Sequence, residues 1–533
     1  MPKTTAPKAL HDAILKALAN DGSELAIVDV REEQAFADNH LLYAISVPLS
    51  RLELLMADLA LRKDAAVVLC DAGNGEDLAA RAAVKLESYG YSDVSVLEGG
   101  TAGWTAAGYE GYAGFNVPSK AFGEHVEHHF GTPSVSAEQL KGMMDSGENM
   151  VILDSRPMDE YNTMNIPGGI CCPGGELVLR AQTIAPDPST TVVVNCAGRT
   201  RSIIGAQSLI NAGLPNKVVA LQNGTMGWHL SGFQLEHGNT ALHPNVETPA
   251  VQVAQKLASG VDQRFQVARA SMDQVKTWQA DTSRSLYLLD VRTADEFAVA
   301  HLAGSKHSPG GQLVQATDRY VGVRGARLVT ICDTGVRSTM AAHWLKQMNW
   351  EVYVLDSGLP ASGLEKGKGA KPVLGASDEA DSLGVATLKP ALDVGDTVLI
   401  DLGFSRDYRK GHIPGAHFLI RSRLEQDKAN LPKAASYAVT SEDGLAAAVA
   451  ASELSAALGA PVQALAGGTQ AWVQSGLPLE EGETSMASEP TDVWLKPYER
   501  KGTVEDFMNE YLTWEIALVD QIKRDDTVKF WSP

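Results

Sequence analysis

The sequence lacks the features of a secreted, metal-binding or membrane-spanning protein. It has only five cysteines in 533 residues, and they form neither a regular disulfide framework nor CxxC pairs with metal-ligand spacing. No stretch of about 18 apolar residues occurs, and the N-terminus has no long apolar segment of the kind that marks an export signal. We therefore expect reduced thiols, a cytoplasmic location and no association with a membrane.

Positive charge is also scarce. The chain has 45 Lys and Arg against 65 Asp and Glu, a formal net charge of −20. This balance argues against broad attraction to nucleic acid or to anionic lipid. A small anion can still bind, but only in a local pocket of arginines and backbone N–H groups.

What the chain does contain is a fourfold repeat. In each copy an apolar run ends in Asp, a second apolar run enters a short polar loop, a helix-like segment follows, and a third apolar run closes the unit. The first run ends at Asp29, Asp154, Asp290 and Asp401. Continuous Val/Ile/Leu runs that alternate with helices predict an α/β fold, in which each repeat has a central, mostly parallel β-sheet flanked by helices.

The spacing within the repeats assigns one loop position to each copy. This position lies 42 residues after the strand Asp in the first three repeats and 40 residues after it in the fourth. It is held by Asp71, Cys196, Cys332 and Ser441. Cys70 is therefore out of frame, and we expect it to pack the end of its strand.

The linkers and the tail divide the chain further. We expect domains at residues 1–115, 130–240, 262–368 and 380–483, followed by a C-terminal helical tail at 484–533. In the tail, Thr503 is a candidate helix cap. Phe507, Tyr511, Trp514 and Leu518 then fall at helical spacing. This stripe either docks on the chain's own core or seals a homodimer.

Two of the loops carry candidate chemistry. A Cys at a strand end, followed by a polar loop and a helix N-terminus, is placed where backbone N–H groups and the helix dipole stabilise a thiolate. Cys196 and Cys332 are the candidate nucleophiles. The candidate substrate-binding residues are Ala197, Gly198, Arg199, Thr200 and Arg201 in one loop, and Asp333, Thr334, Gly335, Val336 and Arg337 in the other.

These loops resemble the active-site loops of the rhodanese family, and the resemblance extends over four copies. The segments at 290–297 and 401–417 look like the family's first conserved box. The closing box is matched by GGTAGW, NGTMGW and GGTQAW, which end at Trp104, Trp228 and Trp472. The resemblance implies four tandem rhodanese-like domains and a sulfurtransferase that needs no cofactor and no metal.

The resemblance also implies a mechanism. The Cys196 thiolate attacks the outer sulfur of a small anion such as thiosulfate, sulfite leaves, and the persulfide passes its sulfur to cyanide or a thiol. The loop arginines hold the oxyanions. Related phosphatases of the same fold have a C-x5-R loop, whereas Cys196 to Arg201 and Cys332 to Arg337 are C-x4-R, which favours sulfur over phosphate.

Cys332 is either a second active site or a weakened one, because its closing box, DSGLPASG, lacks Trp and Asp333 adds negative charge. Asp71 and Ser441 cannot carry a persulfide, so we expect the first and fourth repeats to be structural. Cys171 and Cys172 relay sulfur, form a disulfide with Cys196 or, as we expect, pack in the core.

Three further sets of residues have two interpretations each. Glu176 and Arg180 either select substrate or form a surface ion pair at helical spacing. Asp154, Arg156, Asp290 and Arg292 recur with the first strand, so we expect a network that supports the fold. His125, His128 and His129 are better explained by a solvated linker helix than by a metal site.

Two other functions remain open. One is persulfide handling in the catabolism of cysteine, glutathione or mercapto acids, with a thiol as donor or acceptor. The other is a non-catalytic scaffold, or a protein that senses sulfur or redox state, which the loss of the nucleophile in two repeats would favour.

Overall fold

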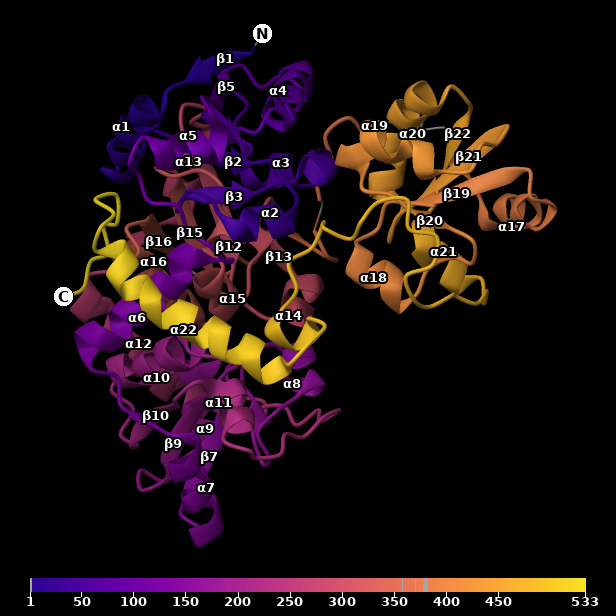
Figure 1. The fold of residues 1–533 in the computed structure, drawn as a ribbon. Helices are drawn as coiled ribbons and strands as arrows, with labels where there is room; N and C mark the ends of the chain where they lie inside the picture. Colours follow the sequence, from indigo (N-terminus) through magenta and orange to yellow (C-terminus); the bar gives the residue numbers. More distant parts are fainter. Residues whose placement is uncertain (1, 357, 370, 377–381) are drawn as a thin grey trace. The chain divides into compact units, whose positions relative to one another are not determined.

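The computed structural model describes residues 2–356, 358–369, 371–376 and 382–533 (Figure 1). It divides into two compact units. Unit 1 consists of Met1–Leu10, Ala26–Gly114 and Lys371–Leu495, and unit 2 of His11–Leu25, Phe115–Ala370 and Lys496–Pro533. Most of the first repeat and the fourth repeat therefore lie in unit 1. The second and third repeats lie in unit 2 with the C-terminal tail.

Each repeat contains one five-stranded sheet, and the strand order is the same in all four. The orders are β1-β5-β4-β2-β3, β6-β10-β9-β7-β8, β11-β16-β15-β12-β14 and β18-β22-β21-β19-β20. The registers within these sheets are parallel. An additional antiparallel pair, β13 with β17, occurs in the third repeat. The predicted α/β fold with mostly parallel sheets is confirmed.

The first two repeats have the following elements. In the first they are β1 (Lys3–Thr5), α1 (Pro7–Leu18), β2 (Leu25–Asp29), α2 (Glu33–Asp38), β3 (Ala44–Ser46), α3 (Leu52–Leu59), β4 (Ala66–Cys70), α4 (Leu78–Ser88), β5 (Val94–Leu97) and α5 (Gly100–Ala106). In the second they are β6 (Ser134–Val135), α7 (Ala137–Ser146), β7 (Met150–Asp154), α8 (Met158–Thr163), β8 (Ile170–Cys171), α9 (Leu177–Ile184), β9 (Thr191–Asn195), α10 (Thr200–Ala212), β10 (Val218–Leu221) and α11 (Gly224–Leu230).

The third and fourth repeats follow the same plan. The third contains β11 (Ala268–Ala270), α13 (Met272–Ala280), β12 (Leu286–Asp290), α14 (Ala294–Val299), β13 (His301–Leu302), β14 (Lys306–His307), α15 (Gly310–Gln315), β15 (Arg327–Ile331), α16 (Val336–Gln347), β16 (Glu351–Leu355) and β17 (Leu364–Glu365). The fourth contains β18 (Ser382–Leu383), α17 (Val385–Val394), β19 (Thr397–Asp401), α18 (Ser405–Lys410), β20 (His417–Phe418), α19 (Leu424–Asp427), β21 (Ser436–Thr440), α20 (Leu445–Leu458), β22 (Val462–Leu465) and α21 (Gly468–Gln474).

In the described part of the chain, three helices lie outside the sheets' own βα units: α6 (Val117–Phe130), α12 (Thr248–Phe265) and α22 (Val504–Ile522). We expected α6 to be a solvated linker, but residues 117–124 are buried. Only its C-terminal end, with His128 and His129, is exposed. The expectation of a helix is thus confirmed and that of solvation is wrong for most of its length, because α6 packs on α10 and α22 within unit 2.

The strand Asp forms the expected supporting network. Arg156 Nε and Nη2 donate to the two carboxylate oxygens of Asp154 at 2.8 and 2.7 Å, and Nη2 also donates to the Met164 carbonyl at 2.6 Å. The first and third repeats repeat this arrangement with Arg31 and Arg292. The pair connects the end of the first strand to the backbone at the end of the next helix, so its role is structural.

The closing-box tryptophans are structural too. Trp104, Trp228 and Trp472 are buried, and the indole Nε1 of each donates to a carbonyl six residues further on, at 2.8 to 2.9 Å. Ser357 of the third closing box and the predicted boundary at residue 380 lie outside the described residues. Among the residues that are described, none of the helices combines the length and apolar character needed to cross a membrane.

Candidate active site

The two candidate nucleophiles occupy equivalent places in unit 2. Cys196 directly follows β9 and Cys332 directly follows β15, and each stands before the helix of its βα unit, α10 or α16. Both side chains are buried, with exposed fractions of 2% and 1%. The strands that precede them, β9 and β15, contain several β-branched residues and are largely buried. The carboxyl end of each strand therefore fixes the place where its loop begins.

The closing box holds the loop from the other side. Thr225 N–H donates to the Cys196 carbonyl at 2.8 Å, and Met226 N–H donates to the Ala197 carbonyl at 3.0 Å. Gly224 has φ +55°, and a Cβ on it would lie 2.3 Å from the Cys196 carbonyl oxygen. Only glycine fits there, which explains the Gly that precedes the Thr of the closing box.

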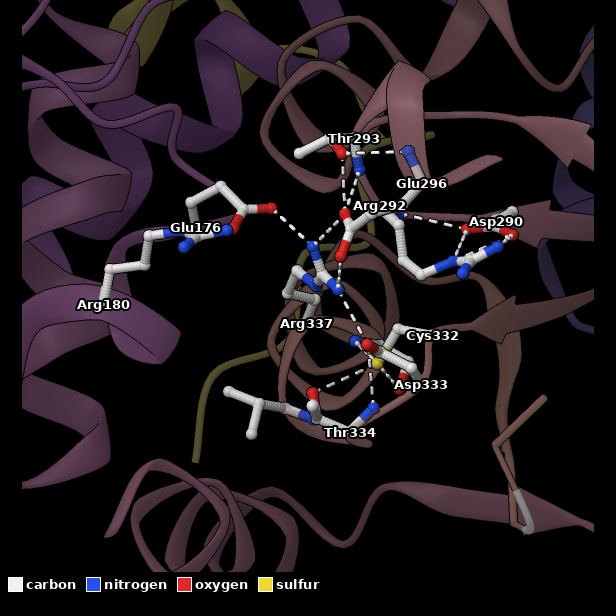
Figure 2. Close-up of polar contacts among 12 residues, drawn as sticks. Glu176, Arg180, Asp290, Arg292, Thr293, Glu296, Cys332, Asp333, Thr334 and Arg337 are labelled. Carbon is white, nitrogen blue, oxygen red and sulfur yellow. Dashed lines mark hydrogen bonds and ion pairs between the residues drawn. The ribbon is translucent and has the colours of Figure 1, made fainter. Parts of the chain in front are cut away.

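The Cys332 loop surrounds its sulfur with hydrogen-bond donors (Figure 2). The backbone N–H groups of Gly335 and Ser338 donate to Cys332 Sγ at 3.1 and 3.4 Å, and the Ser338 hydroxyl lies 3.2 Å from it. The Thr334 hydroxyl is 3.9 Å away. Gly335 has φ +78°, a left-handed conformation that turns its N–H towards the sulfur. This arrangement can stabilise a thiolate or a persulfide.

The Cys196 loop is built differently. The Ser202 hydroxyl donates to Cys196 Sγ at 2.9 Å, and the position of Gly335 is taken by Arg199, which has φ −119°. Burial raises the pKa of the Cys196 thiol; the charge of Arg201 and the Ser202 hydrogen bond oppose this shift.

The predicted substrate-binding arginines of this loop pair with carboxylates of the protein. Arg199 donates to both carboxylate oxygens of Glu124 at 2.7 and 2.8 Å and also contacts Glu127. Arg201 makes two contacts with Glu160 at 3.0 and 2.8 Å and one with the Gln312 side-chain oxygen at 3.2 Å. Both guanidinium groups are therefore fixed before any substrate arrives.

Arg337 of the Cys332 loop lies among three carboxylates (Figure 2). It contacts Glu176 at 2.8 Å, Glu296 at 2.7 and 2.9 Å, and Asp333 at 2.8 Å. The predicted pair of Glu176 with Arg180 exists, with 2.8 Å between Arg180 Nε and Glu176 Oε2, but both side chains are buried. The interpretation of a surface pair is wrong, because Glu176 faces the third repeat instead of solvent.

The contacts of Arg201 and Arg337 are reciprocal. Glu176 and Gln312 each lie 22 residues after the strand Asp of their own repeat, and each reaches the loop arginine of the other repeat. Glycines allow this approach: a Cβ on Gly175 would lie 3.0 Å from the Gly311 nitrogen, and one on Gly311 would lie 2.9 Å from the Gly175 nitrogen. The second and third repeats thus complete each other's loops.

The remaining predicted loop residues have structural partners. Thr200 and Val336 begin α10 and α16, the Thr334 carbonyl accepts a hydrogen bond from Gln255, and Gly198 lies against α22. The contact of Gly198 with the tail had no signal in the sequence. Neither did Glu124 and Glu127 as partners of Arg199, because α6 lies about 75 residues before the loop.

The loop positions without a cysteine are occupied by hydrogen-bonded side chains. The two Asp71 oxygens accept from the N–H groups of Gly73 and Ala79 at 2.9 and 3.0 Å. The Ser441 hydroxyl accepts from Ala447 N–H at 3.3 Å. In the fourth repeat Gly403 replaces the paired arginine, and burial raises the pKa of Asp401 to about 6.

The other cysteines are buried, and all five are free thiols. Cys70 ends β4 and is fully buried, as predicted. Cys171 donates through Sγ to the Arg156 carbonyl at 3.5 Å, and burial raises the pKa of Cys172 well above its usual value. Within the described part of the chain, no group of three or more His, Cys, Asp or Glu side chains is placed to hold a metal ion.

The comparison with known families agrees with this geometry. The model of the rhodanese-like domain matches residues 12–107, 136–231, 271–362 and 385–475. The chain belongs to the rhodanese family. A crystal structure of thiosulfate sulfurtransferase from Pseudomonas aeruginosa is 46% identical, covers 99% of both chains and superposes with a TM-score of 0.94. The predicted family, the tandem rhodanese fold and the class of rhodanese-type transferase are confirmed at this general level.

A second relative matches one part of the chain. A Bacillus subtilis (strain 168) protein, YrkF, which is named as a sulfur carrier protein, is 32% identical over 107 residues. The match includes 20% of this rhodanese chain and spans 56% of the relative's length.

Proposed function

We propose that this protein is a sulfurtransferase that moves a sulfane sulfur from thiosulfate or a related donor to cyanide or a thiol, through persulfides on Cys196 and Cys332. The observation that carries the proposal is the arrangement at Cys332, where two backbone N–H groups and a hydroxyl point at the sulfur. Donors in this arrangement favour an anionic sulfur over a neutral thiol. The kinship with a thiosulfate sulfurtransferase supports the choice of donor.

The chemistry needs only the loop. A cysteine thiolate attacks the outer sulfur of thiosulfate, the S–S bond of the donor breaks, and sulfite leaves with the bonding electron pair. The new persulfide holds one sulfane sulfur. An acceptor thiolate or cyanide then attacks that sulfur, the cysteine S–S bond breaks, and the cysteine thiolate is restored. No net oxidation occurs, so neither step requires a redox cofactor.

The arginines act in this proposal through their fixed charge. Because Arg199, Arg201 and Arg337 are held by carboxylates, they would meet the oxyanions of a donor without reorganising. The proposal includes the predicted contacts of the loop residues with substrate, a cytoplasmic location and the four domain boundaries predicted above.

A non-catalytic scaffold is the second candidate. The hydrogen-bonded Asp71 and Ser441 favour it for the first and fourth repeats, because neither side chain can form a persulfide. The same argument does not extend to the second and third repeats, which keep their cysteines.

The test is thiocyanate formation from thiosulfate and cyanide, compared in the wild type, Cys196→Ser, Cys332→Ser and the double substitution. We expect each single variant to lose part of the activity and the double variant to lose at least 99% of it, or about 100-fold. Cys70→Ser is the matched control, since that thiol lies outside the frame. A double variant with full activity would rule out both sites.

The intermediate is tested separately by mass spectrometry after incubation with thiosulfate alone. We expect an added mass of about 32 Da, one sulfur atom, on peptides that contain Cys196 or Cys332. Tryptic cleavage separates the two thiols into residues 181–199 and 328–337. Failure to find the adduct with any sulfane donor would favour the scaffold.

A further inference from the structure

The C-terminal helix α22 lies directly on the Cys196 loop. A Cβ on Gly198 would lie 3.2 Å from Glu515 Oε2, 3.3 Å from Tyr511 Cε1 and 3.7 Å from Leu512 Cδ2. An added Cβ would therefore be at or inside van der Waals contact, so the three α22 side chains lie close over the loop two residues after the nucleophile. The sulfurtransferase proposal above does not use any of them.

Two kinds of contact hold α22 in this place. Met508 and Leu512 are buried in a cluster with Met226, and Ala197 of the loop packs against it. The Thr200 hydroxyl donates to Glu515 Oε1 at 2.6 Å. Since Thr200 begins α10, Glu515 is bonded to the first residue of the helix that follows Cys196.

Glu515 brings a buried negative charge to this site. Its exposed fraction is 1%, and within the described chain no hydrogen-bond partner satisfies Oε2, the oxygen that faces Gly198. The charge adds to the effect of burial in raising the pKa of the Cys196 thiol.

Among the described residues, the cations near this site do not form a hydrogen bond with Glu515 Oε2. Arg199 and Arg201 already have the carboxylates of Glu124, Glu127 and Glu160 as partners. Lys120 of α6 lies over the Tyr511 and Trp514 rings, 4.6 and 4.4 Å from their centres. Its burial lowers its pKa to about 8, and the charge of Glu515 opposes this shift. The surroundings of Cys196 therefore include a carboxylate oxygen that has no cation bonded to it.

The Cys332 loop has a neutral neighbour at the comparable place. Its Thr334 carbonyl accepts a hydrogen bond from the Gln255 side-chain amide at 3.0 Å. Gln255 belongs to α12, so each loop of unit 2 is contacted by a helix from outside its own sheet. The two helices differ in the charge that they present.

We propose that α22 is a wall of the Cys196 site and that Glu515 is a specificity-determining residue, which favours uncharged sulfur compounds over anionic ones at Cys196. Within the proposed sulfur transfer, Cys196 takes its sulfane sulfur from a neutral persulfide, whose S–S bond breaks to release a thiol, and the Cys196 persulfide passes that sulfur to an acceptor thiol, whereas an anionic donor such as thiosulfate reacts more readily at Cys332. An anion that approaches the loop meets the unpaired Glu515 oxygen in a site from which water is largely excluded, where like charges repel more strongly than in water. An uncharged reagent that donates a hydrogen bond satisfies the same oxygen.

The experiment compares alkylation by iodoacetamide, which is neutral, with alkylation by iodoacetate, which is an anion of similar size. Rates are followed by mass spectrometry on the two tryptic peptides, so Cys332 is an internal reference in the same molecule. Alkylation reads the thiols directly and does not depend on sulfur transfer. It therefore separates this inference from the proposed function.

In Glu515→Gln, we expect the iodoacetate-to-iodoacetamide rate ratio at Cys196 to rise by about fivefold, because the charge disappears while an oxygen remains for Thr200. The ratio at Cys332 stays unchanged. Glu510→Gln is the matched control, since it removes the same charge from an exposed position of α22. An unchanged ratio at Cys196 in Glu515→Gln, or an equal rise in Glu510→Gln, overturns the assignment of Glu515.

Leu512→Asn tests the wall itself in the full chain. Loss of the buried leucine loosens α22, and we expect both reagents to modify Cys196 at least about tenfold faster, with Cys332 as before. If Cys196 is no faster, α22 does not cover the site. If both cysteines become faster, the variant has lost its fold, and the Glu515→Gln ratio alone decides the proposal.

Discussion

The loops of Cys196 and Cys332 have the same length and the same C-x4-R spacing, yet they hold their sulfur atoms differently. In the Cys332 loop the third residue after the cysteine is Gly335, whose left-handed backbone turns an N–H to the sulfur. In the Cys196 loop this residue is Arg199, whose side chain reaches Glu124 and Glu127. The two loops thus share the cysteine and the last arginine of the C-x4-R motif but differ in the hydrogen-bond donors around the sulfur.

The partners of the last arginine differ as well. Arg337 has three carboxylate partners, whereas Arg201 has one carboxylate and the neutral Gln312. In the Cys332 site the additional carboxylates surround the last arginine. In the Cys196 site the additional carboxylate is Glu515, which lies over the loop. Residues outside a loop can therefore tune two copies of the same loop independently.

The largest expected effect concerns the buried charges of Arg337. Arg337→Met leaves Glu176, Glu296 and Asp333 without this cation, and we expect a loss of about 3–5 kcal/mol in the free energy of unfolding. Arg201→Met is the matched variant. It leaves only the Glu160 carboxylate without its cation. We therefore expect its loss in the free energy of unfolding to be about 1–3 kcal/mol smaller than that of Arg337→Met. Urea denaturation followed by tryptophan fluorescence measures both, and equal losses would remove this difference between the loops.

The next effect concerns Gly335. Gly335→Ala must adopt φ near +78°, which costs a residue with a side chain about 1–2 kcal/mol, although no atom lies within 4 Å of the added Cβ. We expect sulfur loading of Cys332 to slow by about tenfold and that of Cys196 to be unaffected. Gly304→Ala is the control, because Gly304 has φ +74° and equally open surroundings away from the loop. Equal slowing in the control would mean that backbone strain, and not the N–H, is responsible.

The third effect is a pH dependence that both loops should share. Burial disfavours the charged forms of Glu160 and Glu296, but Arg201 and Arg337 outweigh it and lower each pKa to about 2. A carboxylate with a lowered pKa in the folded state stabilises the protein above its unfolded pKa, near 4.5, and this stability is lost as the pH falls towards 2.

We therefore expect the destabilisation caused by Glu160→Gln to be smaller at pH 4 than at pH 6, by roughly 0.5–1 kcal/mol. Glu296→Gln should change in the same direction. Denaturation of both variants and the wild type at the two pH values provides the measurement. A destabilisation that is independent of pH would show that Arg201 does not hold Glu160 in its charged form.

The repeats and the loop frame were predictable because they depend on local sequence. The apolar runs, the Asp before the first loop and the spacing of 42 residues are periodic signals, and they placed Cys196 and Cys332 after buried strands while excluding Cys70. The Asp–Arg network was predictable for the same reason, since Asp154 and Arg156 are two residues apart.

The contacts between distant segments were not predictable. Glu515 lies more than 300 residues after Thr200, its hydrogen-bond partner. The sequence pattern of its helix indicated the aromatic residues Tyr511 and Trp514 as the packing residues, and it gave no sign that Glu515 is buried. Glu176 appeared to pair with Arg180 on a surface, because nothing in its own repeat reveals that Arg337 approaches it. One sequence records the spacing within a repeat, whereas the packing of one repeat on another has no periodic signal.

The smallest expected effect comes from exchanging Glu176 and Gln312, the two residues that each contact the loop arginine of the other repeat. Glu176→Gln takes one negative charge from Arg337, so its positive charge stabilises the Cys332 thiolate more, and we expect alkylation of Cys332 to be about twofold faster. Gln312→Glu gives Arg201 a second carboxylate, and alkylation of Cys196 should become about twofold slower. The two rates are measured on the two tryptic peptides of each variant, and each variant's unaffected cysteine is its control. One substitution removes a negative charge and the other adds one at the equivalent position. If charge from the neighbouring repeat sets thiol reactivity, the alkylation rate of Cys332 in Glu176→Gln and that of Cys196 in Gln312→Glu must change in opposite directions. Changes in the same direction would contradict this reciprocal coupling.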